Sequence, residues 1–338
     1  MTGPATTLGL LFDVRNPAAW QQPWGEVIGS ALDQVVEAER LGAGSIWATE
    51  HHNFEDGYLS QPLTFLASAA ARTTRIRLGT GVLLASMRHP RHISEQAALI
   101  DQISGGRLEL GVGAGYAAEE FELFGRDLSK RMTLADAKIR ELKADLWDGA
   151  LNPPPTQERL PLWLGYQGPQ GAKRAGRLGV GLLAPNAALL PSYLEGLSEG
   201  GHDPALAAMG GMIPMVLATD PERTAQIIAP HYAHQTRTYA QARVTDGSVV
   251  AAQDHDEVVK QLLDPTSRGL RVVEVATAAA ELGALRAAAP IRHLYFWASV
   301  AAMPQSVVAE HMSLIFGPLA EQLGISSQGP VPDQARLP

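Results

Sequence analysis

Two adjacent histidines, His51 and His52, follow a carboxylate, Glu50, at the end of a short apolar stretch that begins at Ser45. An apolar stretch with helical sequence on both sides is typical of a parallel strand that is buried on both faces. Parallel α/β folds place their chemistry at the carboxyl ends of such strands. A histidine there could donate or accept a proton, so we predict a catalytic role for His51 or His52.

Side chains alternate along a strand, so only one of the two histidines can face the centre of the fold. The residues alone also allow a simpler interpretation, in which one histidine binds a backbone carbonyl and the other is exposed. A metal site would need a third ligand, for which Glu50 is a candidate. The pair lacks the His-x-His or His-x-x-x-His spacing of metal ligands, so we predict no metal site.

A glycine-rich stretch, Gly111, Gly113 and Gly115 with Tyr116 after it, ends another apolar stretch. It is similar to a dinucleotide-binding turn, but a lone glycine run is a weak signal. In a Rossmann unit this turn would follow the first strand, whereas here it follows the fourth. We therefore interpret it as a tight turn that lets a flat ring or a phosphate lie close to the backbone.

A second polar turn, which contains Gln167, Gly168, Gln170 and Gly171, opens a predicted helix. Free N–H groups at a helix N-terminus attract phosphate. Arg131, at the start of another predicted helix, could bind a phosphate with two parallel hydrogen bonds. An exposed structural arginine is an equally acceptable interpretation of Arg131.

The scaffold that positions these residues is predicted from alternating strands and helices. Eight strands are predicted. In chain order they are Leu8–Val14, the short stretch that begins at Ser45 and runs into Thr49 and Glu50, Ile76–Leu84, Leu108–Val112, Leu162–Gly165, Val180–Ala184, Met212–Ala218 and His293–Ser299. The predicted helices are Ile28–Leu41, Leu59–Ala71, His92–Ile103, Met132–Trp147, Gln170–Arg177, Leu189–Glu199 and Pro304–Leu323. This order predicts a (β/α)₈ TIM barrel, with a doubly wound open sheet as the alternative.

The segment of about residues 220–289 is too long for an ordinary connection between the seventh and eighth predicted strands. We predict that it is an insertion that forms a lid over the mouth of the barrel. Residues 1–325 are predicted to form a single domain, and residues 326–338 a loose tail. Asp101 and Arg107, on either side of a turn, are interpreted as a structural pair.

Composition excludes several classes of protein. The chain has 338 residues, of which 46% are hydrophobic and 18% charged, which is typical of a globular protein. A net charge of −8 without a dense run of Lys or Arg argues against nucleic acid or an anionic membrane as partner. The chain has no cysteine, no stretch approaches a membrane span, and its start does not resemble a signal peptide, so we expect a cytoplasmic protein.

Several short motifs in order resemble the bacterial luciferase-like flavin monooxygenases. They are Glu50-His51-His52, Gly79-Thr80-Gly81-Val82, His89-Pro90, the stretch Leu99–Arg107 and Phe124-Gly125. Each motif is weak by itself, but their order and spacing agree from about Leu8 to Trp147, and less closely after that. The family fold is a (β/α)₈ barrel with an insertion near strand seven.

The resemblance implies that reduced FMN, supplied by a separate flavin reductase, binds at the barrel mouth and reacts with O₂ through a C4a-peroxide to oxygenate a small organic substrate. It implies that His51 is the catalytic histidine beside the flavin and that His52 is structural. Thr80, Gly81 and Val82 would line the pocket under the ring, with an unusual cis peptide between Gly81 and Val82. The other expected cofactor contacts are Gly111, Gly113, Tyr116, Arg131, Gln167, Gly168, Gln170 and Gly171.

The chain departs from luciferases at Ala114, where they carry an arginine. F420-dependent oxidoreductases of the same superfamily often have a glycine-rich turn at this point, so reduced F420 is the alternative cofactor. They usually carry Asp-His where this chain has Glu50-His51-His52, and we therefore favour FMN. A flavin-binding protein without turnover is a further alternative, against which His51 argues.

The resemblance also implies a homodimer that pairs through helices near the alanine-rich stretch Leu59–Ala71. An apolar mouth is expected, since five aromatic residues are predicted to lie near it. They are Trp20, Trp24, Phe54, Tyr58 and Trp297. This favours a hydrophobic or aromatic substrate, although one sequence does not identify the compound.

Overall fold

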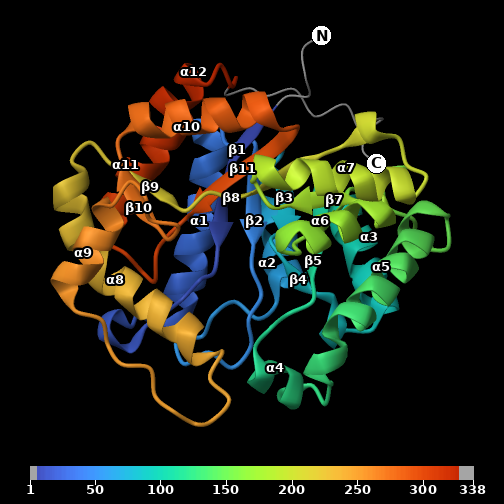
Figure 1. Cartoon of the computed structure of the whole chain (residues 1–338), viewed down its shortest axis with the longest axis horizontal. Helices are drawn as coiled ribbons and strands as arrows, with labels where there is room; N and C mark the ends of the chain where they lie inside the picture. The colour runs from blue at the N-terminus through green and yellow to red at the C-terminus, as the bar shows by residue number, and fades with distance from the viewer. Residues whose placement is uncertain (1–5, 327–338) are drawn as a thin grey trace.

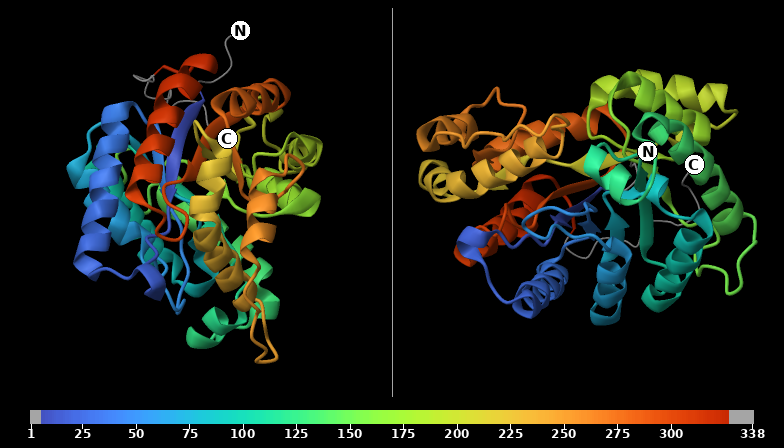
Figure 2. Two further views of the ribbon diagram at one scale, coloured as in Figure 1. Left: turned by 90° about the vertical axis from the view of Figure 1, so that its left-hand side faces the viewer. Right: turned by 90° about the horizontal axis from the view of Figure 1, so that it is seen from below.

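In the computed structural model, which describes residues 6–326, eight parallel strands close into a barrel that helices surround (Figures 1 and 2). The barrel strands are β1 (Thr7–Phe12), β2 (Ser45–Ala48), β3 (Arg77–Thr80), β5 (Leu108–Gly113), β6 (Leu162–Leu164), β7 (Gly181–Leu183), β8 (Met209–Met212) and β11 (Ile291–Trp297). β1 pairs with β2 and β11, and β3 pairs with β5, which closes the ring. The predicted (β/α)₈ TIM barrel is confirmed.

Helices cover the outside of the barrel between successive strands (Figure 1). They are α1 (Trp24–Leu41), α2 (Pro62–Arg72), α3 (Pro90–Ser104), α4 (Ala118–Leu123), α5 (Arg131–Trp147), α6 (Gly168–Leu178), α7 (Leu190–Glu199), α8 (Pro221–Gln241), α9 (His255–Leu263), α10 (Val275–Ala288), α11 (Gln305–Leu314) and α12 (Ala320–Gln322). Gly42 ends α1 in the left-handed conformation, at φ 100°, where glycine carries no steric penalty. In the described part of the chain, no helix is long and apolar enough to span a membrane.

The seventh strand of the barrel differs from its prediction. The apolar stretch Met212–Ala218 contains β9 (Met215–Leu217), which pairs with β10 (Arg271–Val273) in a small separate sheet. The barrel strand is β8, which contains Gly210 and Gly211 and therefore lacks the apolar pattern of its neighbours. A Cβ at Gly210 would lie 2.7 Å from the carbonyl oxygen of His293, so this glycine allows β8 and β11 to approach.

The predicted insertion, residues 220–289, contains α8, α9, β10 and α10. In Figure 1 the strands run downward, and the loop that follows α8 lies at the lower end of the molecule, as does α4. This end carries the carboxyl termini of the strands, so the end of α8 contributes side chains to the mouth of the barrel. Its action as a lid stays a prediction. The predicted tail lies outside the described residues except for Ser326.

Large aromatic side chains fill the barrel interior. Trp47 stacks on Tyr295 with ring centroids 4.8 Å apart and meets Trp163 edge-on at 6.4 Å. These rings need space on the neighbouring strands, and a Cβ at Gly79, the partner of Trp47 across β2 and β3, would lie only 2.3 Å from the Trp47 ring. Gly181 stands in the same relation to Trp163, also at 2.3 Å. The glycines of the inner face are therefore complementary to the tryptophans.

An ion pair lies in the interior at the level of the first strand residues. Arg77 donates to Glu109, and Trp163 Nε1 donates to the second oxygen of Glu109 at 2.7 Å. Burial by itself would raise the pKa of Glu109, but Arg77 and His293 outweigh burial and lower it to about 2. The carboxylate therefore stays charged and holds three strands together.

Asp101 and Arg107 are both buried and structural, but no ion pair joins them within residues 6–326, so the predicted pair is wrong. Arg107 donates to the carbonyls of Thr73 and Ile76, at 2.9 and 2.8 Å. The Asp101 carboxylate accepts from the backbone and side chain of Gln157, at 2.8 and 2.7 Å. Arg107 therefore holds the connection between α2 and β3, and Asp101 holds the connection that precedes β6, both at the end of the barrel where the strands begin.

Candidate active site

His51 follows β2 at the carboxyl end of the barrel, and a glutamate fixes its ring. Its Nδ1 lies 2.7 Å from Oε1 of Glu120, a residue of α4 that is 1% exposed. The same oxygen accepts the backbone N–H of His52 at 2.7 Å. Because an ionised carboxylate only accepts hydrogen bonds, Nδ1 carries the proton of the ring, and Nε2 is the nitrogen without a proton. The hydroxyl of Tyr116 lies 3.4 Å from Nε2.

Four aromatic rings surround His51. The ring centroids of Phe54, Tyr58, Tyr116 and Tyr239 lie 4.6, 4.8, 5.3 and 5.7 Å from that of the imidazole. They come from the loop after β2, the loop after β5, and α8. His51 is 7% exposed, so this aromatic cage keeps bulk water away from the imidazole. The predicted position of Phe54 and Tyr58 near the mouth is confirmed by these contacts.

A buried arginine lies beside the cage. Arg15, which follows β1, donates from Nε to Asp13 at 3.0 Å and from Nη1 to Asp56 at 2.8 Å. Nη1 also donates to the hydroxyl of Thr238 on α8 at 2.7 Å, and the guanidinium lies 4.3 Å from the ring centre of Tyr58. Burial raises the pKa of Asp13 to about 6, although Arg15 acts in the opposite direction. The cluster fastens α8 to the mouth.

His52 turns away from His51 and binds Glu50, with 2.8 Å between Nε2 and Oε1. Arg88 donates to the same oxygen at 2.7 Å, and the second carboxylate oxygen accepts the N–H of Leu84 at 2.9 Å. This geometry ties the loop after β2 to β4 (Leu83–Leu84).

Across residues 6–326, no group of three or more His, Cys, Asp or Glu side chains is arranged to hold a metal ion.

The peptide Gly81–Val82, predicted to be cis, is cis in the structure. Both residues are half-buried at the mouth. A Cβ at Gly113 or at Gly165 would lie 2.5 Å from a methyl group of Val82, so these glycines make room for that side chain. Gly113, the last residue of β5, and Gly165, which follows β6, therefore accommodate Val82. The half-buried Gly81–Val82 peptide and Gly165 form part of the floor of the mouth.

Two predicted contacts take part in the same packing. The hydroxyl of Thr80 donates to the carbonyl of Gly111 at 2.6 Å, which joins β3 to β5. Both residues are buried, and a Cβ at Gly111 would lie 2.1 Å from the carbonyl oxygen of Thr80. Tyr116 is half-buried, and the guanidinium of Arg243 lies 4.7 Å from its ring centre.

The predicted phosphate turn lies at the start of α6. Gln167 is the N-cap, Gly168 has φ 72°, and no side chain of the described residues caps the helix. Asp136 of α5 accepts from Tyr166 at 3.0 Å and from Arg174 of α6 at 2.6 Å, which joins the two helices. The backbone N–H groups of Gly168, Gln170 and Gly171 therefore lie at a helix start that no side-chain hydrogen bond caps.

Arg131 begins α5, is half-buried, and donates to the carbonyl of Leu128 at 3.3 Å. The structure gives it no contact with the turn Gln167–Gly171, so the two predicted phosphate ligands are not brought together by direct bonding.

Sequence analysis missed Glu120 and the cluster of Arg15. Glu120 is one of three glutamates in α4, and nothing in their spacing distinguishes it.

The fold and this site define a class of protein. It is a (β/α)₈ barrel whose mouth carries a carboxylate-oriented histidine among aromatic rings. A family model of luciferase-like monooxygenases matches residues 7–295, and the chain belongs to this family.

Two curated proteins and one solved structure are similar to this chain. A 4-hydroxyprotoasukamycin monooxygenase of Streptomyces nodosus subsp. asukaensis is 39% identical over 109 residues, which cover 31% of this chain and 29% of the relative. An F420-dependent glucose-6-phosphate dehydrogenase of Amycolatopsis mediterranei is 30% identical over 198 residues, or 52% of this chain and 59% of that protein. The crystal structure of monooxygenase RslO1 from Streptomyces bottropensis has a TM-score of 0.76 at 24% identity and covers 94% of this chain and 99% of that one, which supports the fold.

Proposed function

We propose that the protein is a flavin-dependent monooxygenase that uses reduced FMN and O₂ to oxygenate a small, apolar or aromatic organic substrate. The observation that carries this proposal is the position of His51, fixed by Glu120 and enclosed by aromatic rings. An oxygenation site must keep water away from reactive species and still offer a group that handles protons, and this site offers both. The monooxygenase relative with 39% identity supports the same activity.

The residues at the mouth fit a flat ring with a phosphate tail. The half-buried Gly81–Val82 peptide and Gly165 form a floor without bulky polar groups. A Cβ at Gly168 would meet nothing within 4 Å, so the uncapped start of α6 has room for an anion. The ring of FMN would lie on the floor, and the N–H groups of the turn Gln167–Gly171 would hold its phosphate. Arg131 adds a positive charge at the start of the neighbouring helix.

The chain itself has three tasks in this proposal. His51 accepts or donates a proton at Nε2, while Glu120 keeps the proton of the ring on Nδ1 and stabilises positive charge on the imidazole. Phe54, Tyr58 and Tyr239 exclude water. Reduced FMN, when bound, supplies the electrons that activate O₂.

Two partners belong to the proposal. The first is a separate flavin reductase that supplies the reduced FMN, as the membership of the luciferase-like family suggests. A homodimer is supported by apolar side chains that face solvent on α1 and α3, the helices that pack on either side of α2. Leu99 and Ile103 of α3 are 56% and 48% exposed, and Val36 of α1 is 41% exposed.

Hydride transfer with reduced F420 is the second candidate, because F420-dependent dehydrogenases are among the relatives. One feature of the mouth disfavours a sugar phosphate as substrate. Arg15, which packs on the same Tyr58 ring as His51, is already neutralised by Asp13 and Asp56. An anionic substrate would meet two carboxylates for one guanidinium there.

The two cofactors are distinguished by anaerobic titration with reduced FMN and with reduced F420. We expect reduced FMN to bind with Kd on the order of micromolar and reduced F420 to bind more weakly. A preference for F420 would contradict the FMN proposal, and binding of neither would contradict both candidates. With a flavin reductase and the substrate in hand, His51→Ala should lower turnover far more than FMN affinity. His255→Ala, an exposed histidine of α9, is the control.

A further inference from the structure

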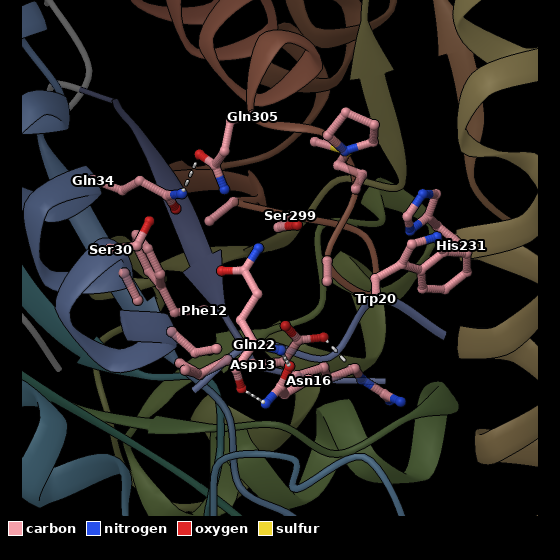
Figure 3. A pocket seen from close by; sticks show the side chains of 18 residues that line it. Phe12, Asp13, Asn16, Trp20, Gln22, Ser30, Gln34, His231, Ser299 and Gln305 are labelled. Carbon is pink, nitrogen blue, oxygen red and sulfur yellow. Dashed lines mark hydrogen bonds and ion pairs between the residues drawn. The ribbon is translucent and has the colours of Figure 1, made fainter. Parts of the chain in front are cut away.

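Two cavities lie near the rings that enclose His51. The larger one, of about 300 Å³, lies between α1, α11 and the loops that follow β1 and β11 (Figure 3). Trp20 lies on one side of it and Ser30 of α1 on the other. None of the four rings around His51 lines this cavity. Arg15, which packs on the Tyr58 ring, lies between the cavity and the rings.

The smaller cavity, of about 170 Å³, lies between the loop after β2, the start of α4 and the end of α8. We call it the α4–α8 pocket. Its lining includes Phe54, whose ring centroid lies 4.6 Å from that of His51. Phe54 therefore belongs both to the pocket and to the aromatic cage, and its ring divides them. The other lining residues are His52, Asn53, Glu55, Ala117, Glu119, Arg237, Thr238, Gln241 and Ala242.

The four rings of the cage differ in how they are held. The hydroxyls of Tyr58 and Tyr239 share a hydrogen bond of 2.8 Å. The guanidinium of Arg243 lies 4.7 Å from the ring centre of Tyr116. Phe54 is half-buried, and its side chain has no polar atom that could form a hydrogen bond. Of the four rings, that of Phe54 therefore rotates at the least cost.

The contacts of Phe54 and the free volume beside it support the same conclusion. The guanidinium of Arg15 lies 5.5 Å from the ring centre of Phe54, against 4.3 Å for Tyr58, so its attraction for the Phe54 ring is weaker. A cavity of about 150 Å³ is known to hold benzene, so the α4–α8 pocket has room for one ring. When Phe54 turns toward solvent, the pocket and the space beside His51 become continuous.

The proposed function requires a way to His51 other than across the floor of the mouth. The Gly81–Val82 peptide and Gly165 form part of this floor, on which the FMN ring would lie. A flavin in that position leaves the substrate to enter from another side. The α4–α8 pocket offers such an entrance.

The charges around the pocket favour a neutral molecule. Glu55 and Arg237 pair with each other at the pocket. Glu119 is exposed and makes no ion pair within residues 6–326, so it repels an anion. His51 is 7% exposed, and a cation that moved beside it would lose its hydration at a large cost in free energy. A neutral molecule meets neither penalty.

We propose that the α4–α8 pocket admits a small neutral molecule with one ring to the side of His51, and that Phe54 is the gate. The molecule displaces the Phe54 ring and takes its place beside the imidazole. That this molecule is the compound oxygenated rests on the proposed function, whereas its passage to His51 does not.

The test is an NMR titration of the flavin-free protein with isotope-labelled histidine, because an aromatic ring shifts the signals of nuclei close to it. The probes share a methylphenyl group: p-cresol is neutral, 4-methylbenzoate is an anion and 4-methylbenzylammonium is a cation. We expect p-cresol to shift the ring signals of His51, identified with His51→Asn, with Kd on the order of 1 mM. The charged probes should bind at least about threefold more weakly. Absence of a shift with p-cresol, or a charged probe that binds as tightly, would overturn the proposal.

A variant of Phe54 tests the gate. Phe54→Ala removes the ring that p-cresol has to displace, so Kd should fall about threefold to tenfold. Phe54→Leu keeps part of the packing and should show a smaller gain in affinity, and circular dichroism shows that each variant is folded. Unchanged affinity in both variants would show that Phe54 is not displaced.

Two tryptophan substitutions test the route. Ala242→Trp fills the α4–α8 pocket and should abolish the shift of the His51 signals by p-cresol. Ser30→Trp fills the larger cavity instead and is the matched control, in which the shift should persist. A shift that persists in Ala242→Trp would refute the route. Because all these measurements use protein without flavin, failure to bind reduced FMN would affect only the proposed function.

Discussion

Replacing Glu120 by alanine should release His51 from the orientation in which the protein holds it. Oε1 of Glu120 accepts two hydrogen bonds of 2.7 Å, from Nδ1 of His51 and from the N–H of His52. Without Glu120 both donors are buried and unpaired, at a cost of about 1–3 kcal/mol each. The free energy of unfolding should therefore fall by roughly 2–6 kcal/mol in Glu120→Ala.

Glu120→Gln separates the role of shape from the role of charge. The amide oxygen still accepts from His51 and His52, but the NH₂ group occupies the position of Oε2, which is buried and has no partner within residues 6–326. One unpaired donor costs about 1–3 kcal/mol, so this variant should lose about half as much stability as Glu120→Ala.

Two measurements check this reasoning on the flavin-free protein. Urea unfolding followed by circular dichroism gives the stability differences, and Glu122→Ala, an exposed glutamate of the same helix, serves as control. Long-range ¹⁵N NMR of the imidazole shows which nitrogen carries the proton, and this readout would not respond to a merely structural loss elsewhere. A wild-type spectrum with the proton on Nε2 of His51 alone, or a Glu120→Ala variant as stable as the control, would refute the assignment.

Three further predictions concern the barrel and its stability. Gly79→Ala places a Cβ 2.3 Å from Trp47 and should cost about 1–3 kcal/mol of stability in urea unfolding; an unchanged midpoint would contradict the packing described for the interior. Glu109→Gln should lower the free energy of unfolding at pH 7 by about 3 kcal/mol, because the folded protein holds the pKa of this carboxyl near 2 instead of 4.5. The stability difference between this variant and wild type should shrink as the pH falls from 4.5 toward 2. Burial lowers the pKa of His311 from 6.5 to about 4, so the unfolded chain binds a proton in this interval that the folded protein does not, and wild type should lose about 3 kcal/mol between pH 6.5 and 4. His311→Asn should lack that part of the pH dependence, and equal pH profiles would show that His311 does not cause it.

Much of the barrel could be predicted because local patterns are sufficient for it. Apolar stretches bounded by glycine and polar residues mark strands that are buried on both faces, as at β1, β5 and β11. The prediction failed at β8, where Gly210 and Gly211 replace apolar residues. Gly210 allows the approach of β11, and Gly211 that of Pro185 in the loop after β7. A pattern of hydrophobicity along one segment carries no information about such neighbours.

The candidate site was predicted in part for the same reason. His51 is a chemically distinctive residue at a strand end, and a strand end is visible in the sequence. Glu120 was missed because it lies 69 residues further along the chain, among other glutamates of a short helix. Arg15 and Thr238 are 223 residues apart, and no local feature of either residue indicates the other.

By itself, then, the sequence determined the alternation of strands and helices, the position of His51 at the mouth and the length of the insertion after β9, because each depends on residues near one another in the chain. Only the tertiary structure decided which carboxylate orients His51, which rings enclose it, and which side chains of α8 meet Arg15. Closing the barrel brings the carboxyl ends of all its strands to one mouth. Side chains from distant segments bind one another there because they are buried and cannot form hydrogen bonds with solvent.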